Sequence, residues 1–128
     1  MKIAISVEST SDLSKDLIEK YDIKIIPYHI ILGDADFKDG ERSPEDIFAF
    51  VDKNKILPKT TAINEFEYVE YFAELKKEYD AVVHITLSSC ISSSCSNAEK
   101  AAAETQNVYV VDSKSLSTGI ALLALYAR

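Results

Sequence analysis

The stretch DAVVHITLSSCISSSCSNAEKAAAET, residues 80–105, says most about the fold. Residues 80–88 read as a strand that is apolar enough to be buried on both faces of a sheet. Residues 96–105 read as a helix. Six of the nine positions from Ser88 to Ser96 are serine. A buried strand that leads into a helix is the unit of a parallel α/β sheet, and the serines occupy the turn between them.

The same alternation of strands and helices extends to both ends of the chain. Further strands are expected at 2–7, 23–32 and 107–112, with Pro27 at a bulge or an unpaired edge position. Residues 33–41 predict a short excursion or hairpin, and residues 55–63 predict a loop. Helices are expected at 11–22, after Ser43, after Asn64 and at 117–128. The 128 residues are enough for one domain, and the pattern predicts an α/β fold of three layers, a mostly parallel sheet flanked by helices.

Capping signals and apolar stripes locate the helices more closely. Ser43, Pro44 and Asp46 form the start of one helix, and Asn64 with Glu67 forms the start of the next. Ser11 or Asp12 is the expected cap of the first helix. The inward-facing residues are predicted to be Leu13, Leu17, Ile18 and Tyr21, then Ile47, Phe48, Phe50 and Val51, then Phe66, Val69, Phe72 and Leu75, and finally Ile120, Leu122, Leu123, Leu125 and Tyr126.

Charge and composition exclude several classes of protein. The net charge is −7 and no basic block occurs, which argues against binding to nucleic acid or to anionic lipid surfaces. No segment reaches membrane-spanning length, and the N-terminus is too short for a signal sequence. Two cysteines, Cys90 and Cys95, are too few for a zinc site. We therefore expect a cytoplasmic protein with reduced thiols, no metal, no cofactor and no stable membrane insertion.

The serine run is suited to holding an anion. Ligands of open α/β sheets bind outside the carboxyl ends of the strands, where this turn lies. The first N–H groups of the following helix lack intrahelical partners and carry the positive end of the helix dipole. Capping alone needs only one or two hydroxyls, so it accounts for part of the run.

Two other classes of function remain as alternatives, a serine-dependent hydrolase or acyltransferase and a generic small-anion binder. A hydrolase requires a Gly-x-Ser-x-Gly elbow, but the chain has no glycine between Gly40 and Gly119. A phosphate-binding loop is also absent. His29 and His84 read as strand histidines with no acid partner evident, and Glu8 and Asp12 read as acids that stabilise a helix start. We expect Asp112 and Ser113, at the end of a strand, to stabilise the serine turn without contacting the ligand themselves.

Four segments, residues 2–27, 58–72, 84–102 and 108–119, resemble in order and spacing the DegV family of bacterial fatty-acid-binding proteins. The resemblance spans the whole chain but only about the first half of a typical member. The final helix ends at Arg128 without a C-cap glycine, as a truncated helix would. The resemblance therefore implies a single lipid-binding domain, residues 1–128, without the C-terminal domain of the family. It implies a non-enzymatic protein that buries a long-chain fatty acid between two domains, and in some members presents the acyl group to a fatty acid kinase for phospholipid synthesis.

The resemblance also assigns site residues. The threonine of the family's Pro-Lys-Thr-Ser motif falls on Thr60, and its serine–glycine pair falls on Ser92 and Ser93. The hydroxyls of Thr60 and Ser92, with the N–H of Ser93, are expected to hold the carboxylate, so the two hydroxyls should lie close together. Ser93 replaces a glycine, and Ala62-Ile63 replaces a common Gln-Pro. If a second domain normally covers the acyl chain, an apolar strip that includes the final helix should be exposed here.

Overall fold

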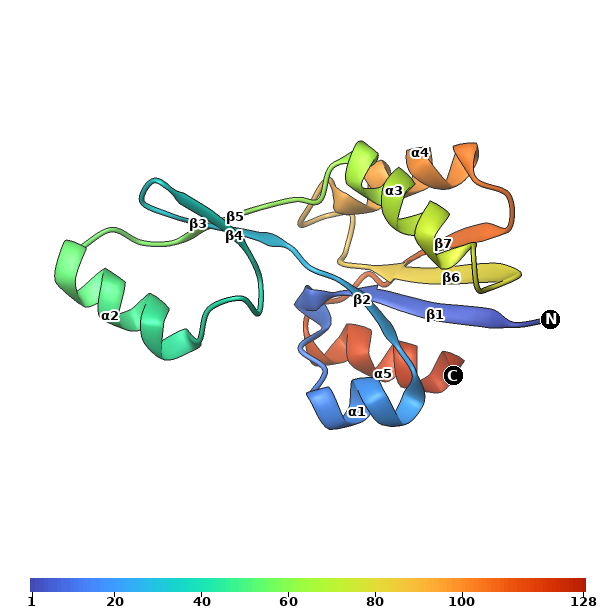
Figure 1. Ribbon diagram of the computed structural model, residues 1–128, viewed down its shortest axis with the longest axis horizontal. Coiled ribbons are helices and arrows are strands. Elements are labelled where there is room, and N and C mark those ends of the chain that lie inside the picture. Colours follow the sequence, from blue (N-terminus) through green and yellow to red (C-terminus); the bar gives the residue numbers. More distant parts are fainter.

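A four-stranded parallel sheet forms the centre of the molecule, and the computed structural model describes all 128 residues (Figure 1). The strand order is β2-β1-β6-β7, and each neighbouring pair is parallel. The strands are β1 Ile3–Glu8, β2 Lys24–Ile26, β6 Ala81–Thr86 and β7 Val108–Asp112. The predicted α/β fold with a mostly parallel sheet flanked by helices is confirmed.

Two pairs of helices cover the two faces of this sheet (Figure 1). Helices α1 (Lys15–Tyr21) and α5 (Thr118–Ala127) lie on one face, and α3 (Glu65–Leu75) and α4 (Ser94–Glu104) lie on the other. The central strands β1 and β6 are buried between these layers. The largest fully buried apolar side chains of this core are Tyr68, Phe72, Ile63 and Ile120. Burial of side chains of this size contributes about 1.5–3 kcal/mol each, which makes the core between the layers the main source of stability.

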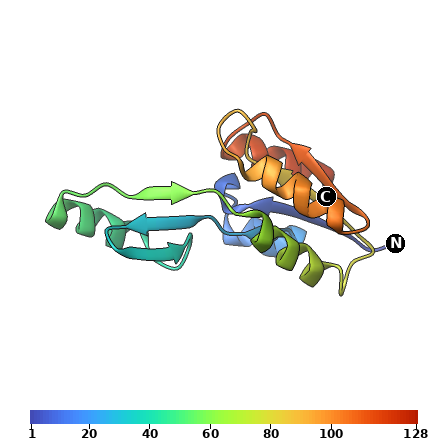
Figure 2. The ribbon, with the colours of Figure 1, turned by 90° about the horizontal axis from the view of Figure 1, so that it is seen from above.

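A second, smaller sheet extends away from the first (Figures 1 and 2). Its strands are β3 His29–Leu32, β4 Ala35–Lys38 and β5 Lys59–Thr61, in the antiparallel order β4-β3-β5. The helix α2 (Pro44–Asn54) connects β4 to β5. We call residues 29–61 the arm. The arm is an insertion between β2 and α3, and its two ends pair directly, with His29 opposite Thr61 and Ile30 opposite Thr60.

The structure corrects two strand predictions. The expected strand 23–32 is two strands in different sheets, because Pro27 has no N–H to donate and the N–H of Tyr28 donates to Ser9 Oγ at 3.0 Å instead of to a neighbouring strand. The expected loop 55–63 contains β5, whose only strand partner is β3, about 30 residues earlier. The predicted hairpin is confirmed as β3–β4, and Gly33 takes the positive φ of +63° that its turn requires.

The helix starts are predicted better than the buried faces. The capping boxes at Ser43–Asp46 and Asn64–Glu67 are confirmed. The cap of α1, however, is Ser14, because a short 3₁₀ turn (Ser9–Ser11) precedes it and Asp12 ends that turn in a left-handed conformation. The predicted stripe on α2 is confirmed only in part: Ile47, Phe50 and Val51 are half-buried and Phe48 is exposed, because the arm is too thin to bury any of them fully. Four more residues predicted to face inward are instead exposed: Phe66, Leu122, Leu123 and Tyr126.

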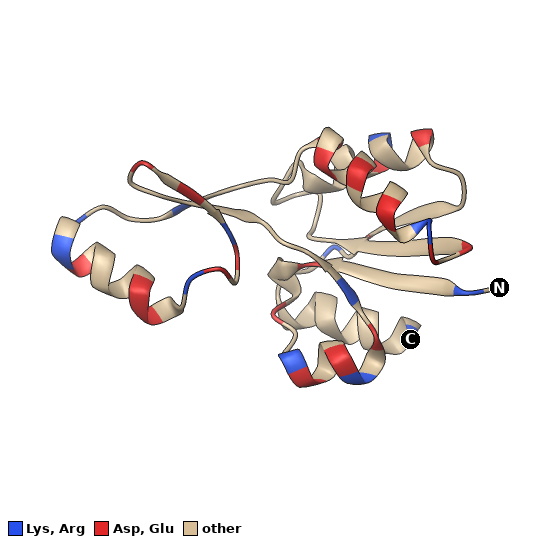
Figure 3. Ribbon diagram, in the orientation of Figure 1, with Lys and Arg blue, Asp and Glu red and all other residues tan.

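Charge is distributed unevenly over the surface (Figure 3). Helix α3 carries four glutamates, Glu65, Glu67, Glu70 and Glu74, and no basic residue. The apolar side chains of Leu122, Leu123 and Tyr126 on α5 are exposed to solvent, as are Ile91 and Leu116 near the serine turn. None of the helices is both long enough and apolar enough to cross a bilayer.

Candidate functional site

One cavity brings together the three residues assigned from the sequence. Thr60, Ser92 and Ser93 line a cavity of about 310 Å³ at the carboxyl end of β6, where the arm joins the main sheet. Its other lining residues are Tyr28, Ala62, Leu87 and Ile91. Three sources of hydroxyl and N–H donors therefore converge with four largely apolar neighbours. This composition suits a ligand that has a polar head and an apolar tail.

The serine turn presents donors because of how it folds. The N–H groups of Ile91 and Ser92 both donate to the carbonyl of Ser88, at 2.9 and 3.2 Å, which closes the turn. Helix α4 then begins at Ser94, two residues earlier than predicted, with Ser93 as its N-cap. The side chain of Ser93 makes no capping bond, and its N–H makes no hydrogen bond within the protein. A free N–H at a helix N-terminus is an anion-binding group.

Thr60 reaches the cavity from the arm. It lies on β5, opposite Ile30 on β3, so its position depends on the strand pairing within the arm. Ser92 and Ser93 lie 32 and 33 residues later in the chain, in the turn that follows β6 of the parallel sheet. The cavity is thus formed by two parts of the molecule, and the prediction that Thr60 and Ser92 approach one another agrees with their both lining it.

A buried carboxylate supports the serine turn from below. Glu8 is completely buried, and its Oε1 accepts hydrogen bonds from Tyr68 Oη at 2.5 Å and Ser94 Oγ at 2.6 Å. Its Oε2 accepts the N–H of Leu87 at 2.8 Å. The prediction that the Glu8 side chain stabilises the start of the adjacent helix is wrong, because it makes no capping bond there. Three of its four partners belong to α3, to α4 and to the residue after β6, and the fourth is the nearby Thr10 hydroxyl at 3.2 Å. The three buried partners are 60 to 86 residues away in the sequence, and no local pattern points to them.

A second set of contacts holds the other end of the turn. Asp112 Oδ1 accepts the N–H of Ser89 at 3.2 Å, and Lys114 lies 2.7 Å from Asp112 Oδ2. The hydrogen bond from Lys114 is the largest cause that lowers the pKa of Asp112 below its usual range. The N–H of Ser88 also donates to the carbonyl of Ser115 at 3.1 Å. The expected support of the serine turn by Asp112 is therefore confirmed.

The two histidines lie outside the cavity. His84 is completely buried among Tyr68, Tyr71 and Phe72, and this burial lowers its pKa to about 3. Its Nδ1 lies 2.9 Å from Ser6 Oγ, and its Nε2 has no partner. His29 does have acid partners, contrary to expectation.

The acid partners of His29 join the arm to α3. Its Nδ1 lies 2.9 Å from Asp36 on the arm, and its Nε2 lies 2.6 Å from Glu67 on α3. The hydrogen bond with Asp36 is the largest cause that raises the pKa of His29, and the bond with Glu67 comes next. Glu67 lies 38 residues after His29, on a segment that the sequence predicts as a separate helix, so the spacing along the chain did not indicate the His29–Glu67 pair.

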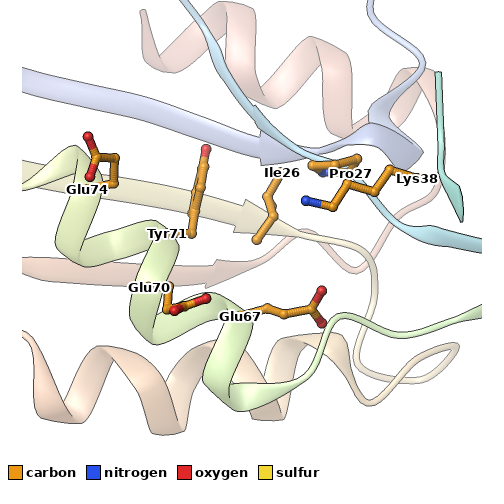
Figure 4. A pocket seen from close by; sticks show the side chains of 7 residues that line it. All are labelled: Ile26, Pro27, Lys38, Glu67, Glu70, Tyr71 and Glu74. Carbon is orange, nitrogen blue, oxygen red and sulfur yellow. The ribbon is translucent and has the colours of Figure 1, made fainter. Parts of the chain in front are cut away.

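A neighbouring cavity of about 360 Å³ has the opposite character (Figure 4). Glu67, Glu70 and Glu74 line it from α3, and Lys38 is its only basic residue. Three carboxylates repel a fourth, so this cavity is a poor site for a carboxylate ligand. The comparison of the two cavities favours the one with Ser92 as the anion site.

The comparisons with known proteins agree on one family. The family model described as "Uncharacterised protein, DegV family" matches residues 2–128. A fatty acid-binding protein of Thermotoga maritima is 36% identical over 133 residues, covering 100% of this chain and 46% of the relative. The structure of a fatty acid-binding DegV family protein from Thermus thermophilus superposes with a TM-score of 0.90 at 30% identity, covering 99% of this chain and 46% of that one.

The structure of DegV, a fatty acid binding protein from Bacillus subtilis, gives the same TM-score of 0.90 at 32% identity, covering 99% of this chain and 46% of the neighbour. The chain thus spans less than half the length of the relatives it matches. The similarity extends over nearly every residue of this chain, including the arm and the serine turn.

Proposed function

Because this chain belongs to the DegV family, we propose that it binds a long-chain fatty acid whose carboxylate is held by Thr60, Ser92 and Ser93. The observation that carries the proposal is the cavity in which a hydroxyl of the arm meets a serine and a free N–H at the start of α4. The relatives named for fatty acid binding support the same ligand class.

The head group and the tail contribute differently to binding. A hydrogen bond to a charged group contributes roughly 1.5–3 kcal/mol, so two or three such bonds orient the carboxylate. Each buried methylene contributes about 0.8 kcal/mol, so a long tail supplies most of the gross affinity. The first apolar contacts of the tail at the cavity are with Leu87, Ala62 and the exposed Ile91.

The proposed biological role of the protein has three parts. The protein acts as a carrier and not as an enzyme, since the neighbours of Ser92 Oγ are the Tyr28 hydroxyl and the N–H of Ser94, neither of which is a base. It presents the bound acid to a fatty acid kinase in the cytoplasm. A second domain covers the tail when one is present, and exposed Leu116 and Leu122 are suited to such a contact.

Titration with palmitate tests the ligand and the head-group site together. We expect the Ser92→Ala and Thr60→Val variants to bind palmitate roughly tenfold more weakly each, the loss of one hydrogen bond to a charged group. Ser96→Ala is the matched control, because Ser96 is an exposed serine on α4 outside the cavity. The control should bind like the unaltered protein.

Other ligands in the same titration separate the alternatives. Acetate that binds as tightly as palmitate would indicate a small-anion binder. Mass spectrometry that finds an acyl group covalently attached to Ser92, or turnover of an acyl ester, would indicate a serine-dependent hydrolase or acyltransferase. Absence of palmitate binding by the unaltered chain would contradict the proposal for this domain.

A further inference from the structure

Tyr28 is fixed at the junction of the main sheet and the arm. Its N–H donates to Ser9 Oγ at 3.0 Å, and its carbonyl accepts the N–H of Asp39 at 2.8 Å. Pro27, directly before it, restricts the backbone further. The side chain is only 5% exposed and lines the cavity beside Ser92. Tyr28 is therefore held by the scaffold and has little freedom of its own.

The hydroxyl of Tyr28 lies 2.9 Å from Ser92 Oγ. A serine hydroxyl has two lone pairs and one proton. One lone pair of Ser92 Oγ already accepts the N–H of Ser94 at 3.1 Å. If Tyr28 donates to the other, both lone pairs are used, and the proton of Ser92 is left to donate to a third group.

Two facts favour Tyr28 as the donor of this pair of hydroxyls. A phenol is a stronger acid than an aliphatic alcohol, so it is the better donor and the poorer acceptor. Burial, followed by the nearby Glu8 carboxylate, raises the pKa of Tyr28, so the phenol keeps its proton at neutral pH. The Tyr28 hydroxyl is thus available as a donor throughout the physiological range.

We propose that Tyr28 is a positioning residue that, together with the N–H of Ser94, sets the Ser92 hydroxyl to donate into the cavity. This inference rests on the proposed function and adds to it a reason for specificity. A preset donor favours a head group that only accepts hydrogen bonds, such as a carboxylate. It disfavours a head group that must itself donate to Ser92, such as an ammonium. Tyr28 acts through Ser92 and needs no contact with the ligand.

A double-mutant cycle with palmitate tests whether Tyr28 acts through Ser92. We expect Tyr28→Phe, which keeps the ring, to weaken palmitate binding roughly fivefold in the presence of Ser92, since orientation accounts for part of one hydrogen bond. In the Ser92→Ala background the same change should have no effect. Tyr79→Phe is the matched control, because it removes another tyrosine hydroxyl, one bonded to Asp22 outside the cavity. Urea denaturation of every variant checks that each is folded.

Equal losses in the two backgrounds would overturn the inference, because Tyr28 would then act on the ligand or the fold without Ser92. No loss in either background would also overturn it. If Tyr28→Phe does not fold, 3-fluorotyrosine at position 28 replaces it, and this more acidic phenol should tighten binding only when Ser92 is present. Failure of the unaltered chain to bind palmitate would instead refute the proposed function, and the inference with it.

As a spectroscopic check, palmitate labelled with ¹³C at the carboxyl carbon should show a different bound chemical shift in Tyr28→Phe than in the unaltered protein. The bound shift should be unchanged by Tyr79→Phe. An unchanged shift in Tyr28→Phe would mean that the hydrogen bond from Ser92 to the carboxylate does not depend on Tyr28, which also contradicts the inference.

Discussion

Glu8→Ala is expected to destabilise the protein strongly, although Glu8 does not line the candidate site. The carboxylate accepts hydrogen bonds from Tyr68, Ser94 and the N–H of Leu87, all of which are buried. The fourth donor, Thr10 Oγ1 at 3.2 Å, is partly exposed and can turn to water. Removal of the carboxylate therefore leaves three buried donors without their acceptor.

The size of the loss in stability of Glu8→Ala depends on which of the three buried donors can find another acceptor. Tyr68 Oη and Ser94 Oγ lie 2.6 Å apart and can bond to each other. The N–H of Leu87 has no such neighbour, and an unsatisfied buried donor costs about 1–3 kcal/mol. With one hydroxyl proton also unsatisfied, the free energy of unfolding should fall by about 2–6 kcal/mol, a large part of the 5–15 kcal/mol typical of a domain.

Glu8→Gln should cost less, about 1–2 kcal/mol, because it keeps the shape of the side chain. Its amide oxygen can accept the N–H of Leu87, and its amide nitrogen can donate to the two hydroxyls, which rotate to accept. What it loses is the extra strength of hydrogen bonds to a charged acceptor.

Urea denaturation followed by far-ultraviolet circular dichroism at pH 7 measures both changes. Glu104→Ala, at an exposed position on α4, is the control and should stay within about 0.5 kcal/mol of the unaltered protein. A loss of less than about 1 kcal/mol for Glu8→Ala would refute the reasoning, since it would mean that water or a local shift satisfies the buried donors.

Three further predictions concern the histidines and the serine turn. Burial lowers the pKa of His84 to about 3, so its contribution to stability is present above pH 6.5 and is lost as the pH falls from 6.5 towards 3. In that interval His84→Gln should reduce the slope of the free energy of unfolding against pH by up to about 1.4 kcal/mol per pH unit. Asp36 and Glu67 raise the pKa of His29, so the contribution of His29 to stability is present below pH 6.5 and is lost as the pH rises through the raised pKa. His29→Gln should remove this loss of stability at higher pH. We expect the loss to be under about 1 kcal/mol, because His29 and its two acid partners are partly exposed. A fluorophosphonate probe should leave Ser92 unlabelled, because no base contacts its hydroxyl, and stoichiometric labelling detected by mass spectrometry would support the hydrolase alternative.

The sequence was sufficient where the signals are local. The capping boxes at Ser43 and Asn64 depend on residues three positions apart, and the buried strand before the serine turn depends on its own composition. The family motifs located Thr60 and Ser92 because their order along the chain is preserved. Their roles as ligand contacts remain predictions.

The sequence was insufficient where a residue's partners are distant. Glu8 stands beside a helix start, and only the folded chain shows that it bonds to Tyr68 and Ser94 instead. The stripe on α2 is amphipathic in the usual way, but the arm's small sheet covers it only in part, so none of its residues is fully buried. The proposed role of Tyr28 depends on the contact between its hydroxyl and that of Ser92, and these two residues are 64 positions apart in the sequence.

The direct pairing of the arm's two ends has a consequence for how this architecture can be altered. His29 and Thr61 lie opposite each other in an antiparallel pair, which places their Cα atoms about 4.5–5.5 Å apart. Arms of different length can therefore be exchanged at this junction, as a cassette, without moving the parallel sheet. Such an exchange carries Thr60 with it and leaves Ser92 and Ser93 in place. Evolution, or a protein engineer, can thus replace one half of the head-group site while the other half is inherited unchanged.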